Sequence, residues 1–262
     1  MEELAYLLLG LVQGLTEFLP VSSSGHLTLG QALLGLGEED LTFTVLVHGA
    51  TALSTVVVFR QDLMSLAKHA FVMDENGAQA RKYLLMLALS AVPAAVVGLG
   101  FKEQIESLAS PSFVGAMLVV TACILFLSQR AQAGNASVNP ARSFGIGIAQ
   151  ALAILPGVSR SGSTIGAALI LGVSREEAAR FSFLMALPPI AGATLLTLKD
   201  LMEAGGDTSG AGNVVGYALG TVAAFVSGWA ACTWMIRLVK RSNLAGFGVY
   251  CLVAGVLALI FG

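Results

Sequence analysis

Apolar runs dominate this chain and limit what it can fold into. They predict helices at 4–19, 27–36, 42–59, 82–100, 113–128, 145–155, 163–172, 180–198, 214–236 and 246–261. A helix needs about 20 residues to cross the ~30 Å hydrocarbon core of a bilayer, and six of the runs approach that length. Asp, Glu, Lys and Arg make up only 11% of the residues, against about 25% in soluble domains. We therefore expect an all-α polytopic membrane protein.

Two polar interruptions fall between runs that are too short to cross the bilayer. The first reads Leu19-Pro20-Val21-Ser22-Ser23-Ser24-Gly25-His26, and the second reads Leu155-Pro156-Gly157-Val158-Ser159-Arg160-Ser161-Gly162-Ser163-Thr164. Proline and glycine end helices, and hydroxyls satisfy freed backbone groups. Irregular backbone at membrane depth persists only where it is buried in protein or lines a wet cavity. The pattern predicts two re-entrant helix pairs, at 4–36 and 145–172.

The two breaks are also copies of each other. A shift of 137 positions aligns Gly10, Gln13, Leu15, Val21, Ser22, Ser24 and Gly25 with Gly147, Gln150, Leu152, Val158, Ser159, Ser161 and Gly162. We expect two tandem repeats, 1–134 and 135–262, each with one re-entrant pair followed by three transmembrane helices. Because three spans change sides, the second repeat would be inverted in the membrane relative to the first.

Loop charges orient the predicted spans. Nine Lys and Arg residues fall in 60–82, 129–145 and 237–245, whereas the loops at 101–112 and 199–213 hold two. Cytoplasmic loops carry an excess of basic residues, so both termini are expected outside. The net charge of −2 offers no concentrated basic surface for a nucleic acid.

Three ionisable residues lie inside the predicted re-entrant segments: Glu17, His26 and Arg160. Charge at the bilayer centre costs about 2.5–3.5 kcal/mol per residue on insertion scales, so each needs a reason. Inverted repeats bring their paired breaks together near the midplane. The three groups are thus expected to share one cavity with the hydroxyls of Ser22, Ser23, Ser24, Ser159, Ser161 and Thr164.

This set of groups suits a phosphate. Helices that restart after Gly25 and Gly162 would offer free N–H groups and the positive end of a dipole, and Arg160 adds a planar fork that matches phosphate oxygens. Glu17 would orient His26, act as a base, or hold a divalent cation, Mg²⁺ or Ca²⁺, mainly through phosphate oxygens and water. Structural alternatives stay open: Arg160 and Glu17 form an ion pair that joins the repeats, and the serines only cap backbone groups.

Further polar residues have competing interpretations. Gln13 and its repeat partner Gln150 would bond the broken backbone or take part in the chemistry. His48 lies mid-span in an apolar run and is interpreted as a hydrogen-bonded core residue.

At these residues the sequence resembles the undecaprenyl-diphosphate phosphatase family, the bacterial membrane proteins associated with bacitracin resistance. The motifs that carry the resemblance are Gln13-Gly14-Leu15-Thr16-Glu17, residues 20–26 and residues 156–164. The first motif is often Glu-x-x-x-Glu in that family, so Gln13 is a departure that weakens any two-carboxylate metal site. The resemblance implies a divalent-cation-dependent enzyme that converts undecaprenyl diphosphate to undecaprenyl phosphate and inorganic phosphate, which recycles the carrier lipid for peptidoglycan synthesis.

Residue chemistry and resemblance together predict the roles. The expected catalytic residues are Glu17, Ser23, His26 and Arg160, with Glu17 also a metal ligand; the expected substrate-binding residues are Gln13, Ser22, Ser24, Gly25, Ser159, Ser161, Gly162 and Thr164. Ser23 is either a nucleophile activated by His26 or a phosphate ligand beside an activated water. The site would open to the extracytoplasmic face of the bacterial plasma membrane and take a polyprenyl diphosphate, in a monomer or a homodimer. The alternative function is a transporter or flippase of a lipid phosphate or small anion, because inverted repeats with broken helices are a transporter architecture.

Overall fold

The computed structural model describes residues 2–34, 41–131, 134–203, 214–241 and 244–261, and over these ranges its regular elements are helices. The helices of the first half are α1 Glu2–Phe18, α2 Ser23–Leu33, α3 Leu41–Val58, α4 Arg60–Ala70, α5 Glu75–Gly100, α6 Lys102–Glu106 and α7 Pro111–Arg130. Those of the second half are α8 Pro140–Leu152, α9 Arg160–Ile170, α10 Arg175–Leu184, α11 Leu187–Glu203, α12 Val214–Arg241 and α13 Ala245–Phe261. The prediction of an all-α protein is confirmed for the described residues.

Several of these helices are long and apolar enough to cross a bilayer. By length and composition they are α5, α7, α12 and the segment Arg175–Thr197, while α3 and α4 would add a fifth span but are bent by 73°. The shorter α13 is also apolar throughout. The chain is thus a multi-pass membrane protein, as its sequence predicts.

Three details differ from the pattern of apolar runs. The helices α4 and α6 were not expected, because α4 is amphipathic and largely polar and α6 has only five residues. The expected span at 180–198 is divided between α10 and α11. Pro188 and Pro189 stand in the first turn of α11, where a missing N–H leaves no intrahelical bond unmade.

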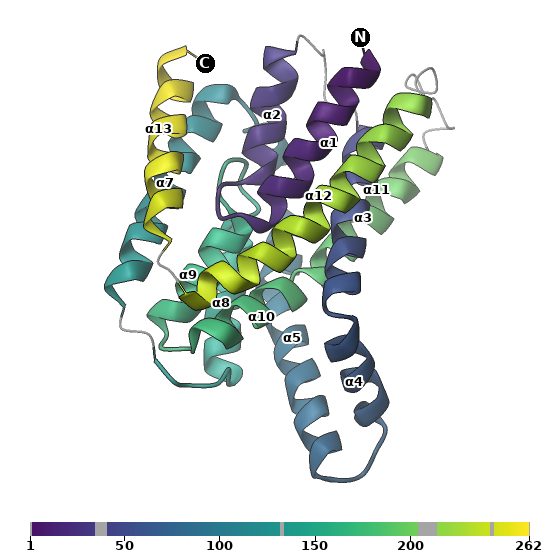
Figure 1. The fold of residues 1–262 in the computed structure, drawn as a ribbon, viewed down its shortest axis with the longest axis vertical. Helices are drawn as coiled ribbons and strands as arrows, with labels where there is room; N and C mark the ends of the chain where they lie inside the picture. The colour runs from purple at the N-terminus through teal and green to yellow at the C-terminus, as the bar shows by residue number, and fades with distance from the viewer. Residues whose placement is uncertain (1, 35–40, 132–133, 204–213, 242–243, 262) are drawn as a thin grey trace.

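The first helix of each sequence repeat packs against a long helix of the other. Figure 1 shows α1 lying along α12, and α8 lies along α5 in the same way. Glycine permits both approaches: a Cβ at Gly10 would lie 2.1 Å from the carbonyl oxygen of Gly220, and one at Gly147 would lie 2.5 Å from that of Ser90. Small residues are what allow helix backbones to come this close in a membrane.

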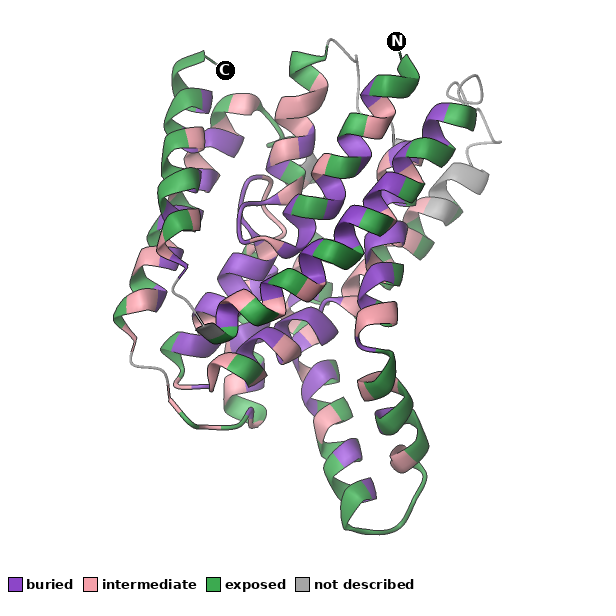
Figure 2. Ribbon diagram, in the orientation of Figure 1, coloured by how far each residue is buried: buried purple, intermediate pink, exposed green. Residues whose placement is uncertain are grey.

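The core lies where α9 and α10 are enclosed by neighbouring helices. Leu118, Ile165 and Phe181 are among its fully buried side chains. Figure 2 shows the buried residues gathered in this central region, whereas α4 and the start of α5 extend from it as an exposed hairpin. Both termini lie at the opposite end of the molecule from that hairpin (Figure 1).

Candidate active site

Each helix break is closed by a serine N-cap. Ser22 precedes α2, and its Oγ accepts from the Gly25 N–H at 3.3 Å; Ser159 precedes α9, and its Oγ accepts from the Gly162 N–H at 3.1 Å. A cap of this kind satisfies one of the unpaired donors at a helix start. The capping interpretation therefore holds for both serines. The N–H groups of Gly25 and Gly162, two residues expected to bind substrate, are the donors to these caps.

The two breaks are in direct contact, although 137 positions separate them. A Cβ at Gly25 would lie 3.3 Å from the Cα of Gly157, and Ser161 Oγ donates to the carbonyl oxygen of Leu19 at 2.9 Å. Gly157 has a φ of 94°, a left-handed conformation that favours glycine. Residues from both halves of the chain thus form one polar centre.

Glu17 lies at the middle of this centre and is 8% exposed. Arg160 Nη2 donates to its Oε1 at 2.5 Å, which is the ion pair anticipated as a structural alternative. Ser23 Oγ donates to Oε2 at 2.6 Å, and Gln13 Nε2 donates to the same oxygen at 3.1 Å. Both carboxylate oxygens therefore have partners, and the carboxylate holds α1, α2 and α9 together.

The second arm of Arg160 has no such partner. Its Nη1 atom is buried and makes no hydrogen bond to any described residue. A buried guanidinium donor is costly unless an acceptor reaches it. An anion with two or three oxygens, such as a phosphate, supplies that acceptor and the matching charge.

His26 is held away from Ser23 in this structure. Its Nδ1 donates to the carbonyl oxygen of Ser22 at 2.8 Å, and its Nε2 lies 2.6 Å from the hydroxyl oxygen of Tyr250 on α13. The two rings are stacked, with an interplanar angle of 14°. The structure pairs Ser23 with Glu17 instead, so the carboxylate is the group placed to take the Ser23 proton.

The remaining polar residues of the two repeats lie in different surroundings. Ser24 lies at the surface of a cavity and is 3.3 Å from Ser22, oxygen to oxygen. Ser161 joins the breaks as described, and Thr164 is fully buried and donates to the Arg160 carbonyl oxygen at 2.8 Å. Gln150 is buried, and neither of its side-chain polar atoms bonds a described residue.

Sequence reasoning missed two residues of the centre. Thr121 on α7 accepts from the Ser159 N–H at 3.0 Å and lies 3.3 Å from the Gly157 carbonyl oxygen, so it fixes the second break. Tyr250 is the partner of His26. Both occur inside apolar runs, where one hydroxyl in the sequence does not reveal a contact with a distant helix.

A metal ion held by the protein needs several donor side chains. Within the described ranges no three His, Cys, Asp or Glu side chains form a group that could hold one. Glu17 is a single carboxylate whose oxygens already accept from Arg160, Ser23 and Gln13. These residues do not fit a protein-ligated divalent cation, which prefers several oxygen ligands.

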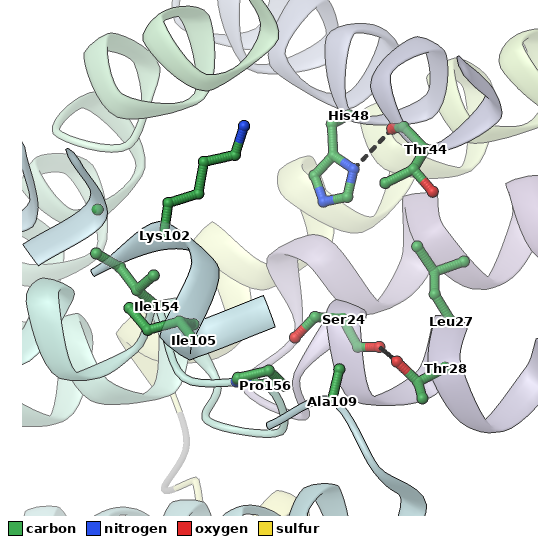
Figure 3. Close-up of a pocket in the computed structure, with 11 residues that line it drawn as sticks. Ser24, Leu27, Thr28, Thr44, His48, Lys102, Ile105, Ala109, Ile154 and Pro156 are labelled. Atoms are coloured by element: carbon green, nitrogen blue, oxygen red, sulfur yellow. Dashed lines mark hydrogen bonds between the residues drawn. The ribbon is translucent and has the colours of Figure 1, made fainter. Parts of the chain in front are cut away.

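A cavity of about 250 Å³ adjoins the centre (Figure 3). Ser24 of the first break and Pro156 of the second form part of its wall. His48 also lines it. Nδ1 of His48 donates to the Thr44 carbonyl oxygen at 2.8 Å, so the residue is hydrogen-bonded as expected but is not confined to the core.

The fold and this centre define a class: a polytopic α-helical membrane protein whose two broken helices enclose a carboxylate, a guanidinium with a spare arm and several hydroxyls. The chain belongs to the family Bacitracin resistance protein BacA, which matches residues 6–257. It is 47% identical over 260 residues to an undecaprenyl-diphosphatase of Christiangramia forsetii, with 97% of this chain and 96% of that protein covered. Proteins of the same name from Parabacteroides distasonis (97% and 96% covered) and Carboxydothermus hydrogenoformans (97% and 95% covered) are 44% and 40% identical.

Proposed function

We propose that this protein is an integral-membrane phosphatase that hydrolyses undecaprenyl diphosphate to undecaprenyl phosphate and inorganic phosphate. Relatives named undecaprenyl-diphosphatase align with nearly its whole length. The observation that carries the proposal is that the two terminal nitrogens of Arg160 differ. Nη2 pairs with Glu17, whereas Nη1 is buried with no described partner. The terminal phosphate of a diphosphate is an acceptor of the right charge and shape for that arm.

Glu17 is the proposed base. Ser23 Oγ donates to it at 2.6 Å, which is the geometry of a nucleophile and its base. In one route Ser23 Oγ attacks the terminal phosphorus, Glu17 takes the hydroxyl proton, and the P–O bond to undecaprenyl phosphate breaks. Water then hydrolyses the phosphoserine. In the other route Glu17 takes a proton from a water held beside Ser23, and that water attacks the phosphorus directly.

Arg160 and the dipoles of α2 and α9 would stabilise the charge of the transferring phosphoryl group. Positioning and electrostatic stabilisation supply most of the catalysis in phosphoryl transfer. The N-termini of α2 and α9 both point into the centre from adjoining breaks, which adds partial positive charge there. His26 remains the second acid–base candidate, with Nε2 shared with Tyr250.

A divalent cation, Mg²⁺ or Ca²⁺, would arrive on the diphosphate oxygens and water, since the described residues provide one carboxylate that is already engaged. Activity is then expected to follow the concentration of the cation–diphosphate complex. This is checked by titrating the cation against a fixed amount of lipid substrate, with a chelator as the zero point.

The same proposal includes the arrangement in the membrane. The repeats 1–134 and 135–262 would be inverted relative to each other, with α1–α2 and α8–α9 as re-entrant pairs. Support comes from equal lengths of 11 residues for α2 and α9, from the matching serine caps, and from the reciprocal packing of α1 on α12 and α8 on α5. With the basic hairpin of α4 and α5 inside, both termini and the mouth of the site would face outside.

The direct test is phosphate release by the purified protein from undecaprenyl diphosphate in detergent or liposomes. We expect release by the wild type and a large loss in Ser23→Ala, whereas Ser65→Ala, a matched change on the distant helix α4, keeps the full rate. Rapid quenching that traps phosphoserine would select the first route. A folded wild type that releases no phosphate under any cation contradicts the proposal and favours a transporter.

A further inference from the structure

Ser22 is a strained residue within the first break. It has a φ of 70° and a ψ of 99°, and among the described residues it is the only one other than glycine with a positive φ. A residue with a Cβ disfavours this conformation, which persists only where neighbouring contacts hold it. The next residue, Ser23, begins α2 and donates to Glu17 at 2.6 Å. The conformation of Ser22 therefore decides where the Ser23 hydroxyl points.

His26 binds the carbonyl oxygen of Ser22 from one turn further along α2. Its backbone N–H donates to that oxygen at 3.2 Å, and its Nδ1 donates to it at 2.8 Å. A carbonyl oxygen only accepts, so Nδ1 carries the proton and Nε2 of the neutral ring is an acceptor. The Tyr250 hydroxyl supplies the donor, with its oxygen 2.6 Å from Nε2 and the two ring centroids 5.6 Å apart. None of these contacts requires a charge on the imidazole.

The position of Tyr250 is fixed because α13 packs closely on α7. A Cβ at Gly255 would lie 2.7 Å from the carbonyl oxygen of Gly115, and a Cβ at Gly115 would lie 2.9 Å from that of Gly255. Cys251, which follows Tyr250, is fully buried, and its Sγ donates to the carbonyl oxygen of Pro20 at 3.5 Å. Helix α13 thus contacts the first break or its neighbour α2 through two consecutive residues.

We propose that Tyr250 is a positioning residue for the reaction. Through His26 it holds the carbonyl of Ser22, and this hydrogen-bonded chain is here called the brace. The braced break keeps the Ser23 hydroxyl directed at Glu17. The inference rests on the proposed function, in which Ser23 is either the nucleophile or the group beside the attacking water. Because the Tyr250 hydroxyl is engaged with His26, its loss should affect the chemical step and not substrate binding.

The test compares kcat and KM for undecaprenyl diphosphate in purified variants, with thermal unfolding measured on the same samples. Tyr250→Phe removes the hydroxyl and keeps a ring for the stack. We expect kcat to fall about 10- to 100-fold, because misplacing a reacting group by ~1 Å costs about 10²-fold. KM should stay within about twofold, since binding of the substrate is unchanged. Tyr217→Phe on α12 is the matched control, because Tyr217 packs on Tyr6 and Phe43 away from the breaks, and it should keep the wild-type rate.

Two background variants show whether Tyr250 acts through His26 and Ser22. In a His26→Leu background, Tyr250→Phe should change kcat by less than about twofold, since the effects of residues in one chain of contacts are not additive. In a Ser22→Gly background it should cost less than about threefold, because glycine adopts a positive φ without steric cost and needs no brace. Glycine is also tolerated at an N-cap. Each comparison is a ratio of two rates in one background, so it holds when that background is slower than the wild type.

Three kinetic results would overturn the brace. They are a wild-type kcat in folded Tyr250→Phe, a loss that is undiminished in the His26→Leu background, and a loss that is undiminished in the Ser22→Gly background. The last result would mean that Tyr250 acts on proton transfer by His26 and not on the position of Ser23. A loss of rate that merely follows the folded fraction would also contradict the brace, because it would make Tyr250 a structural residue.

Imidazole ¹⁵N spectra test the first contact of the brace without turnover. The chain has three histidines, and the His26 signals are those that disappear in His26→Leu. The Nε2 signal of His26 should shift in Tyr250→Phe, because the nitrogen loses its donor, and an unchanged signal would refute the contact. Hydrolysis by the wild type tests the proposed function separately, so failure of the brace and failure of the enzyme activity are distinguishable.

Discussion

Replacing Arg160 by lysine separates the two tasks of its guanidinium. One arm pairs with Glu17, and the other, Nη1, is buried without a described partner. An ammonium is a single point charge that can restore the ion pair but cannot donate in two directions as a planar fork does. We expect Arg160→Lys to keep most of the stability and to lose most of the activity.

The magnitudes follow from burial. Removing one partner of a buried pair costs about 3–5 kcal/mol. The lower end applies to Arg160→Leu, because its side chain is 17% exposed and Glu17 keeps its bonds from Ser23 and Gln13. At about 2–4 °C per kcal/mol for a chain of this size, Arg160→Leu should lower Tm by about 6 to 12 °C, and Arg160→Lys by much less. Both should lose about 10³- to 10⁵-fold in rate, as other phosphoryl-transfer enzymes do without their arginine.

Thermal unfolding and phosphate release are measured on the same purified samples. Arg180→Lys is the control, since Arg180 forms a more exposed ion pair with Asp62 at 2.7 Å outside the centre, and the rate of this variant should be unchanged. The double variant Glu17→Leu/Arg160→Leu should recover the Tm without recovering activity, because no buried charge is left unpaired. An Arg160→Lys variant with the wild-type rate would refute a role for the second arm. Rate losses that merely follow the folded fraction would show that the pair is structural only.

Three further predictions concern the surroundings of the centre. Gln13→Leu should destabilise the protein by about 1–3 kcal/mol in chemical denaturation, because it removes a buried donor. Gln13→Glu should fold and keep substantial activity, with a steeper dependence of the rate on Mg²⁺ in a cation titration. Full activity and stability in the Leu variant would contradict this. Thr121→Val should cost a similar free energy, since the Ser159 N–H loses its acceptor, and should lower kcat; an unchanged Tm would show that the break is held by other contacts. In a cysteine-free background, a cysteine at the exposed position Met73 should not react with an impermeant thiol reagent in intact cells, whereas a cysteine at Gln104 should react. The reverse labelling pattern would contradict the proposed orientation in the membrane.

The helix starts show how far sequence patterns reach. The apolar runs place α2 at 27 and α9 at 163, but both begin earlier, at Ser23 and Arg160. Polar residues after the capping serines are already helical, because the cap and not the first apolar residue sets the start. The amphipathic α4 was not predicted for a related reason, because a short and largely polar helix contains no long apolar run.

The centre itself was predictable where a repeat or a charge marked it. Glu17 and Arg160 stand out as charges in apolar surroundings, and the repeat implies that their breaks meet. The pairing of Ser23 with Glu17 rather than with His26 was not predictable, because it depends on how α1 and α2 turn about the break. Likewise, Thr121 and Tyr250 reach the centre only through the packing of α7 and α13. Residues 35–36 of the run at 27–36 and residues 204–213 of the loop at 199–213 lie outside the described residues.

The division of the centre between the two halves has a consequence for synthesis of the protein. Glu17 and Arg160 are 143 residues apart, so at about 5–20 residues per second the ribosome needs roughly 7 to 30 s to produce the second after the first. During that time α1 carries a carboxylate whose arginine does not yet exist, and α12, against which α1 packs, is completed later still. The nascent first half must therefore wait at the insertion machinery or the membrane surface, or keep Glu17 protonated, until the second half arrives. Messages truncated before α12 should yield chains that are removed by membrane proteases.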